Sequence, residues 1–597
     1  MSLIVNVGPT WTRIDGAEQV WLNDLIRNAP EPPFAVVEKR QQVDYLRSCS
    51  ANMLYLENVL PPDQVQWRDP QNRLFEAKAY RFLGKLRAGE PGDYERDWPF
   101  KLKPDPWQLQ VFTHARKMKE IALAPVVLGG GKSKMTIDIA ADKFMRGEID
   151  GVIIIAPNGV HRQWINEAVP EHMTDKVLVR AHIWKPTTKL PKQFPLDPRE
   201  TVKRLRVIAF NVEAFSTQSG KALKMVRALM ATGRWLLVMD ESTRIKNGRA
   251  QRTRVIVKYV APGAACRIIL TGTPVTKGLE DFYTQFEFLN PNIIGMSSWT
   301  GFRNRYCVTI PAYRGAALGA VTIIGYKNQE ELFRKMAPVT FMIGSEVLGL
   351  GEPIRERREV MLTPEQETIY GALAERLYED LIHQRIATPQ NTLVELLRLQ
   401  QVLCGWVYET AVNEEGLETA VGRRIPSNRL RVLRQVLEDT DEQVLTWARF
   451  TPDIDEICRM LTNQDEAAIA NGSLKRYRHA RYDGQVKAAL RDEGKGQFRD
   501  GEIEYMVGNP AAGGTGVDGL QNNCSLAVYY SNSFNREHRW QSEGRIYRRG
   551  QKAVGRVRFL DLVCPGTVDE LFLKAYESTE ELAKMVMRSP IMLRGGR

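Results

Sequence analysis

The sequence predicts an α/β protein with two parallel-sheet domains, helical insertions and a small N-terminal accessory region. Three observations support this fold class. Continuous apolar runs at residues 152–156 and 235–239 are typical of strands buried on both faces, as in parallel sheets covered by helices. Polar or glycine-rich loops follow these runs. A second series of apolar runs, at 444–447, 505–507, 526–529 and 557–562, indicates a second unit of the same kind.

Composition narrows the class of protein. The 597 residues suffice for several domains, and the formal charge of +12 favours a polyanionic partner. The seven cysteines are dispersed without CxxC spacing, which argues for reduced thiols and against a zinc ribbon or a disulfide scaffold. No signal-peptide pattern or long apolar run is present. We therefore expect a soluble intracellular protein without a membrane partner, cytoplasmic in a bacterial or virus-infected cell and nuclear in a eukaryote.

A glycine loop follows the apolar residues 126–128. Gly129, Gly130 and Gly131 precede Lys132 and Ser133, so a strand is expected to turn into a helix through a loop almost without side chains. Such a loop can wrap its N–H groups around a polyphosphate. Lys132 would reach the β- and γ-phosphates of ATP, and the Ser133 hydroxyl would bind Mg²⁺. The full motif has a further glycine where Val126 stands, so a glycine turn without function remains an alternative for this stretch alone.

Two carboxylates provide the second part of the predicted site. Asp240 and Glu241 follow the apolar run 235–239, where Asp240 would hold Mg²⁺ and Glu241 would orient or deprotonate the attacking water. A solvated acidic turn is the alternative.

Upstream, Gln108 lies on an expected helix, and its amide could read adenine with one donor and one acceptor.

A basic segment at residues 535–551 provides the third part. Arg545 and Arg548 are three positions apart, so on a helix they would project from one face. A planar guanidinium suits the charge of a transferring phosphoryl group, which makes both residues candidate arginine fingers. The alternative is a solvated basic helix. Nearby, the glycine-rich residues 511–519 would let the backbone approach a phosphate or ribose closely.

These features divide the chain into six predicted parts. Residues 1–95 form an accessory domain of unknown role. The others are a first ATP-binding lobe (96–276), a mostly helical insertion and linker (277–360), a helical protrusion (361–426), a second lobe (427–577) and a C-terminal tail (578–597). Thr363, Pro364 and Gln366 form the pattern of a capped helix start for the protrusion.

Together the motifs resemble those of the Swi/Snf-like ATPases, the double-stranded-DNA-translocating branch of helicase superfamily two. The resemblance covers about residues 100–577 and implies two RecA-like lobes. It is carried by residues 107–108, 129–133, 154–164, 240–247, 270–274, 444–450, 512–518 and 534–551. In particular, the sequence Arg-Ile-Lys-Asn at 244–247 and the ending Arg-x-x-Arg-x-Gly-Gln at 545–551 are typical of this branch. Ser242 and Thr243 depart from the Ala-His pair common in the family.

The resemblance also implies site residues. Gln108 corresponds to the adenine-reading position, and the further nucleotide contacts are Gly516, Asp518 and Gln541. The implied DNA contacts are Pro157, Asn158, Trp164, Lys246, Asn247, Thr271, Gly514, Thr515 and Asn535. We therefore expect an ATP- and Mg²⁺-dependent motor whose two lobes close on ATP.

The expected activity is movement on double-stranded or branched DNA, bound without sequence preference through its phosphates. Such a motor would remodel DNA or displace bound protein in repair, recombination or replication, and protein partners could bind residues 1–95. One alternative is a DNA or RNA helicase that separates strands. The other is a DNA-binding scaffold that binds ATP without turnover.

Overall fold

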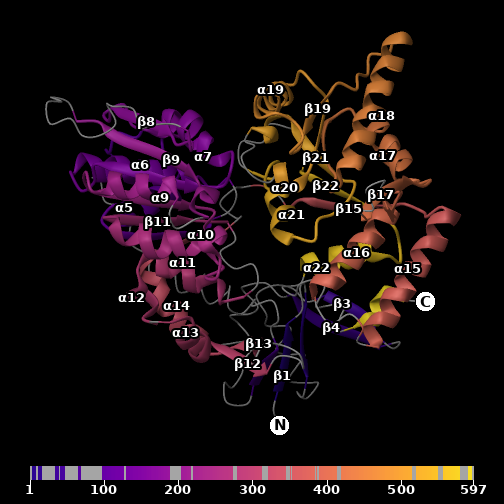
Figure 1. Ribbon diagram of the computed structural model, residues 1–597, viewed down its shortest axis with the longest axis horizontal. Coiled ribbons are helices and arrows are strands. Elements are labelled where there is room, and N and C mark those ends of the chain that lie inside the picture. Colours follow the sequence, from indigo (N-terminus) through magenta and orange to yellow (C-terminus); the bar gives the residue numbers. More distant parts are fainter. Residues whose placement is uncertain are drawn as a thin grey trace. The chain divides into compact units, whose positions relative to one another are not determined.

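The computed structural model divides into two compact units (Figure 1), made of residues 1–127 with 131–347 and residues 348–597 with 128–130. Within the first 96 residues it describes only the backbone of five strands. Beyond them it describes residues 97–126, 129–187, 203–216, 220–272, 278–296, 298–311, 321–344, 350, 352–383, 385, 389–412, 418–513, 519–548, 556–577, 586 and 589–594.

The N-terminal strands form one five-stranded sheet with the order β3-β4-β2-β1-β5. Strand β1 is antiparallel to β2 and parallel to β5. The strands are β1 Leu3–Val7, β2 Trp11–Asp15, β3 Phe34–Glu38, β4 Gln41–Arg47 and β5 Val65–Arg68. The sequence offered no strand pattern for this region.

The first unit contains a seven-stranded sheet in which every pairing is parallel. In spatial order its strands are β14 Thr340–Ile343, β6 Glu120–Val126, β11 Cys266–Leu270, β10 Trp235–Asp240, β7 Gly151–Ala156, β9 Leu205–Asn211 and β8 Val179–Ile183. Alternate residues of β7 belong to two different hydrophobic clusters: Ile153 and Ile155 to one, Val152 and Ile154 to the other. Both faces of the strand are therefore buried, as its continuous apolar sequence predicts.

The helices of this unit are mostly short. They are α5 Pro106–Ala115, α6 Lys132–Met145, α7 Val160–Gln163, α8 Val169–His172, α9 Lys221–Met230, α10 Gln251–Val255, α11 Asp281–Leu289, α12 Pro291–Ile294, α13 Trp299–Tyr306 and α14 Gln329–Met336. The stretch predicted as a helical insertion also contains an antiparallel hairpin, β12 Cys307–Pro311 with β13 Val321–Tyr326. The predicted linker contributes strand β14 to the first sheet, so it is more than a connection.

The second unit contains a six-stranded parallel sheet. In spatial order its strands are β15 Ile354–Glu359, β22 Arg558–Val563, β21 Cys524–Tyr529, β18 Gln443–Trp447, β20 Tyr505–Gly508 and β19 His479–Tyr482. Its helices are α15 Pro364–Ile382, α16 Pro389–Leu403, α17 Arg429–Glu438, α18 Thr451–Ala470, α19 Ala488–Arg499, α20 Pro510–Gly513, α21 Arg536–Glu543 and α22 Val568–Glu577. The two parallel sheets with their helices confirm the predicted fold class.

The start of α15 confirms the predicted capped helix. Thr363 is the N-cap, its hydroxyl accepts the N–H of Gln366, and the Gln366 side chain accepts the N–H of Thr363 in return. The predicted protrusion is not purely helical, because the hairpin of β16 Trp406–Val412 and β17 Glu418–Arg424 follows α16. Among the residues whose structure is described, no helix is long and apolar enough to cross a membrane.

Candidate functional site

The predicted glycine loop leads directly into helix α6, which begins at Lys132. Gly129 and Gly131 have left-handed φ angles of 84° and 85°, a conformation that glycine adopts at little energetic cost. Lys132 and Ser133 occupy the first turn of α6 and are partly exposed. The first N–H groups of a helix point outward and carry partial positive charge, so this end of α6 suits a phosphate group.

Gln108 lies against this loop. A Cβ atom added to Gly131 would stand 2.2 Å from Gln108 Nε2, so the amide occupies the space that a side chain at position 131 would need. The side-chain oxygen of Gln108, Oε1, accepts a hydrogen bond from the backbone N–H of Asp105 at 3.0 Å. This bond anchors the Gln108 side chain at the start of α5. The structure thus brings Gln108 to the glycine loop, and Asp105 is a supporting residue that the sequence reading missed.

Asp240 ends strand β10, and Glu241 follows it with a left-handed φ of 48°. A non-glycine residue in this conformation is strained, and such strain is concentrated at functional sites. The Asp240 carboxylate accepts hydrogen bonds from the Glu241 N–H at 2.9 Å and from the indole N–H of Trp164 at 2.8 Å. Because β10 and β6 are separated in the sheet only by β11, the carboxylate and the glycine loop lie at the same strand-end edge.

Three of the DNA contacts implied by the resemblance are buried. Trp164 is 2% exposed, and Thr271 is fully buried behind β11, where its N–H donates to the Leu123 carbonyl at 3.1 Å. Pro157 is also buried. These positions do not present a side chain to a DNA backbone in this structure. Whether these three positions contact DNA by other atoms stays a prediction.

The remaining implied DNA contacts are more accessible. Asn158, Asn247 and Asn535 are exposed, and Lys246 is partly exposed. Asn535 caps helix α21 through its side-chain oxygen, which accepts the Glu537 N–H at 3.0 Å. Four predicted residues, Gly514, Thr515, Gly516 and Asp518, lie outside the described residues. Whether any of these positions contacts DNA stays a prediction.

Ser242, one of the two residues that depart from the family pattern, makes a buried hydrogen bond in the structure. Ser242 is fully buried, and its hydroxyl donates to the Gln285 side-chain oxygen at 2.6 Å. Gln285 in turn donates to the Asp281 carbonyl at 2.8 Å, within α11. The acidic loop is therefore bound to a helix of the predicted insertion. Sequence reading gave no sign of this contact, because a buried glutamine has no periodic signature.

In the second unit, the predicted arginine pair does not share a helix face. Helix α21 ends at Glu543 with Gly544 as its C-cap, and Arg545 and Arg548 lie in the turns that follow. The prediction of one helical face is wrong, since it assumed that the helix continued past Gly544. Arg545 is 9% exposed and Arg548 is partly exposed. Gln541, the predicted nucleotide contact on α21, is also buried, and its amide donates to Glu537 at 3.1 Å.

Helix α21 is held by a buried charge network that the sequence reading missed. The Arg539 guanidinium donates to Asp561 on β22 at 2.9 Å, to Glu543 at 2.6 Å and to Asn532 at 2.9 Å. Arg355 on β15 binds both oxygens of Glu543, at 2.7 and 2.8 Å. Burial raises the pKa of Glu543, but the charges of Arg539 and Arg355 outweigh it and hold that pKa below its ordinary value.

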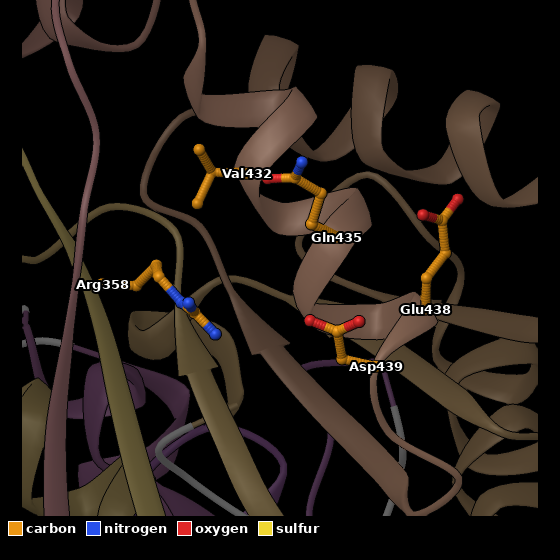
Figure 2. A pocket seen from close by; sticks show the side chains of 5 residues that line it. All are labelled: Arg358, Val432, Gln435, Glu438 and Asp439. Carbon is orange, nitrogen blue, oxygen red and sulfur yellow. The ribbon is translucent and has the colours of Figure 1, made fainter.

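A separate hollow of about 440 Å³ lies in the second unit. Figure 2 shows Arg358 of β15 across from the α17 side chains that line it. It is lined by Arg358, Val432, Gln435, Glu438 and Asp439. None of the predicted site residues is among them. The described residues also contain no group of histidine, cysteine and carboxylate side chains that could hold a metal by themselves.

Curated proteins of several organisms are similar to this chain. It is 25% identical to the DNA repair and recombination protein RDH54 of Saccharomyces cerevisiae over 360 residues, 57% of this chain and 36% of the relative. It is 24% identical to the putative ATP-dependent helicase/translocase YwqA of Bacillus subtilis, over 59% of this chain and 36% of that protein. It is 24% identical to the DNA annealing helicase and endonuclease ZRANB3 of Bos taurus, over 79% and 40%. The chain thus spans 36% to 40% of the length of these relatives.

Among solved structures, the SWI2/SNF2 ATPase core of Sulfolobus solfataricus in complex with double-stranded DNA is similar at 20% identity. The match covers 82% of this chain and 94% of that one, with a TM-score of 0.34. Two family models also match. The helicase conserved C-terminal domain matches residues 428–550, and the SNF2-related domain matches residues 70–405, more than half of the chain. Because this family model matches more than half of the chain, the protein belongs to the SNF2-related family.

Proposed function

We propose that this protein is a DNA-dependent ATPase that uses ATP hydrolysis to move along double-stranded or branched DNA. One observation carries the proposal: the glycine loop at the start of α6 and the Asp240–Glu241 pair lie at the same edge of one parallel sheet. That arrangement provides a phosphate-binding helix end beside carboxylates suited to a metal and a water.

The residues present fit ATP and Mg²⁺. Lys132 and Ser133 are partly exposed in the first turn of α6, where the helix N–H groups suit a phosphate. Lys132 would contact the β- and γ-phosphates, and Ser133 and Asp240 would hold Mg²⁺. The bound metal would neutralise charge on the phosphates. Glu241 would orient the attacking water, and Arg545 and Arg548 would stabilise charge on the transferring phosphoryl group.

The movement on DNA is supported by the family and by the relatives' names. Two relatives are a DNA repair and recombination protein and a putative ATP-dependent helicase/translocase. The charge of +12 suits a phosphate backbone bound without sequence preference. We therefore propose remodelling of DNA, or displacement of bound protein, in repair, recombination or replication, with residues 1–95 available for protein partners.

ATP hydrolysis by the purified chain tests this proposal. Turnover is measured alone and with duplex DNA, branched DNA, single-stranded DNA or RNA, with Lys132→Ala and Arg548→Ala as controls. We expect duplex or branched DNA to stimulate hydrolysis and both substitutions to abolish it. Stimulation by single strands or RNA alone would indicate a strand-separating helicase instead. Absence of hydrolysis with every nucleic acid would indicate a scaffold without turnover.

A further inference from the structure

The indole of Trp164 is bound to the carboxylate that the proposed mechanism assigns to Mg²⁺. Its Nε1–H donates to Asp240 Oδ2 at 2.8 Å, and the two residues are 76 positions apart in sequence. Trp164 begins a π-helical turn, Trp164–Ala168, that continues α7. Such turns are rare and occur often at functional sites.

The geometry of this contact restricts the carboxylate. The Trp164 ring is 2% exposed and belongs to the hydrophobic cluster that also contains Val111 and Phe112 of α5, so the ring cannot turn without disturbing the core. Asp240 Oδ1 accepts the N–H of Glu241 at 2.9 Å. Because both oxygens of Asp240 accept a hydrogen bond, one from Trp164 and one from Glu241, the plane of its carboxylate is restrained from two sides.

A fixed carboxylate matters for a metal ligand. Hydrogen-bond partners behind metal-binding side chains set their orientation, and their loss typically lowers metal affinity or activity about 10- to 100-fold. A buried indole is a rigid donor, since its N–H direction follows from the position of the ring. Trp164 also avoids adding a charge beside the carboxylate, so it orients Asp240 without neutralising it.

We propose that Trp164 is a positioning residue that holds Asp240 in its Mg²⁺-binding orientation, rather than a DNA contact. This inference rests on the proposed ATPase function. It links the π-helical turn after β7 to the end of β10 through one hydrogen bond. The proposal predicts that loss of the indole N–H acts on the Mg²⁺ requirement of hydrolysis and leaves DNA affinity unchanged.

Trp164→Phe tests the inference, because it keeps an aromatic ring and removes the donor. The Mg²⁺ concentration for half-maximal ATP hydrolysis is expected to rise about tenfold. DNA affinity measured without nucleotide is expected to stay within about twofold of wild type, and the KM for ATP at saturating Mg²⁺ is expected to change little. An unchanged Mg²⁺ requirement would overturn the inference, as would a loss of DNA affinity alone.

Trp406→Phe is the matched control. Trp406 also donates its indole N–H to a buried aspartate, Asp453 at 3.1 Å, which lies in the second unit and is no predicted site residue. This variant is expected to lose thermal stability and to keep the wild-type Mg²⁺ requirement. An equal Mg²⁺ shift in both variants would mean that general destabilisation explains the effect, and the inference would be wrong.

A measurement on the wild-type chain covers the case in which Trp164→Phe does not fold. In ¹⁵N-indole-labelled protein, the Trp164 resonance is identified by its shift on Asp240→Asn substitution. We expect Mg²⁺ with a non-hydrolysable ATP analogue to move this resonance more than that of Trp406, and no movement would overturn the inference. If the wild type hydrolyses no ATP with any nucleic acid, the proposed function fails, and this measurement still decides whether Trp164 reports Mg²⁺–nucleotide binding.

Discussion

An alanine at position 131 would be unfavourable for two reasons, the backbone conformation and a steric clash. Its φ of 85° disfavours any side chain, and a Cβ would lie 2.2 Å from Gln108 Nε2. Gly131→Ala is therefore expected to displace Gln108 or the loop and to weaken ATP binding at least tenfold, measured by titration with a fluorescent ATP analogue. Backbone strain alone accounts for about 1–2 kcal/mol.

Gly147→Ala is the control, because it introduces backbone strain without a steric clash. Gly147 follows α6 with a φ of 69°, and nothing lies within 4 Å of a Cβ added there. This variant is expected to lose some stability and to bind ATP as the wild type does. Similar losses of ATP affinity in both variants would contradict the assignment of Gln108 and Gly131 to the nucleotide site.

Asp453 makes the stability of the second unit depend on pH. Its carboxylate accepts hydrogen bonds from Trp406 and Ser531, and burial raises its pKa from 3.8 to about 7. The folded protein therefore holds a proton that the unfolded chain releases, so the free energy of unfolding falls as pH rises from about 4 to about 7. Asp453→Asn cannot ionise. Its melting temperature relative to wild type is expected to be higher at pH 8 than at pH 5, and the reverse trend would contradict the assignment.

Residue spacing predicted part of the site and missed the rest. Gly131, Asp240 and Glu241 follow apolar strands in the sequence, and the structure places the loop and the acid pair at one sheet edge. The Trp164–Asp240 bond could not be predicted in this way, because its partners are 76 residues apart and a buried tryptophan resembles any core residue. Long-range hydrogen bonds leave no local pattern.

At the scale of an element, the stability of helix α21 depends on the buried ion pairs of Arg539. Arg539 is almost fully buried, bonded to Asp561 and Glu543, and its guanidinium lies 3.4 Å from the centre of the Tyr529 ring. Arg539→Met leaves Asp561 buried without its cation and Glu543 with Arg355 as its remaining cationic partner, and an uncompensated buried charge typically destabilises by about 3–5 kcal/mol. We expect a lower melting temperature, faster hydrogen exchange over α21 and a lower kcat, because Arg545 and Arg548 follow this helix directly.

Arg536→Met is the control on the same helix. Arg536 is partly exposed, and its guanidinium lies 3.9 Å from the centre of the Trp540 ring. Its replacement is expected to change stability by less than about 1 kcal/mol, since surface contacts contribute little. Equal effects of the two substitutions would argue against the buried network as the support of α21.

The strands that the sequence missed in the two parallel sheets share one position. Central strands such as β7 and β10 are buried on both faces, so their sequences are continuously apolar. The missed strands β8, β14, β15 and β19 all lie at the edges of their sheets. Strand β15 reads IRERRE, and charges on an edge discourage pairing with other chains. A charged edge strand such as β15 therefore lacks the apolar signal by which central strands are recognised.

At the scale of the whole molecule, the charge balance favours binding to a nucleic-acid backbone. With a formal charge of +12, the chain is expected to bind duplexes of different sequence equally, with an affinity that falls steeply as salt rises. Lys246, partly exposed beside the acidic pair, is one predicted phosphate contact. Lys246→Ala is expected to reduce the slope of log affinity against log salt by about 1, without changing sequence preference.

The salt slope discriminates a phosphate contact from a general loss of positive charge. Lys224→Ala removes the same charge from the exposed surface of α9, at a position that no motif assigns to DNA. If binding depends on net charge alone, the two variants lose affinity in parallel. If Lys246 touches a phosphate, only Lys246→Ala lowers the number of counterions released on binding, and the slopes measured between about 50 and 200 mM salt differ. Equal slopes would place the DNA path away from the end of β10, and the exposed Asn158 and Asn535 would then be the next positions to test.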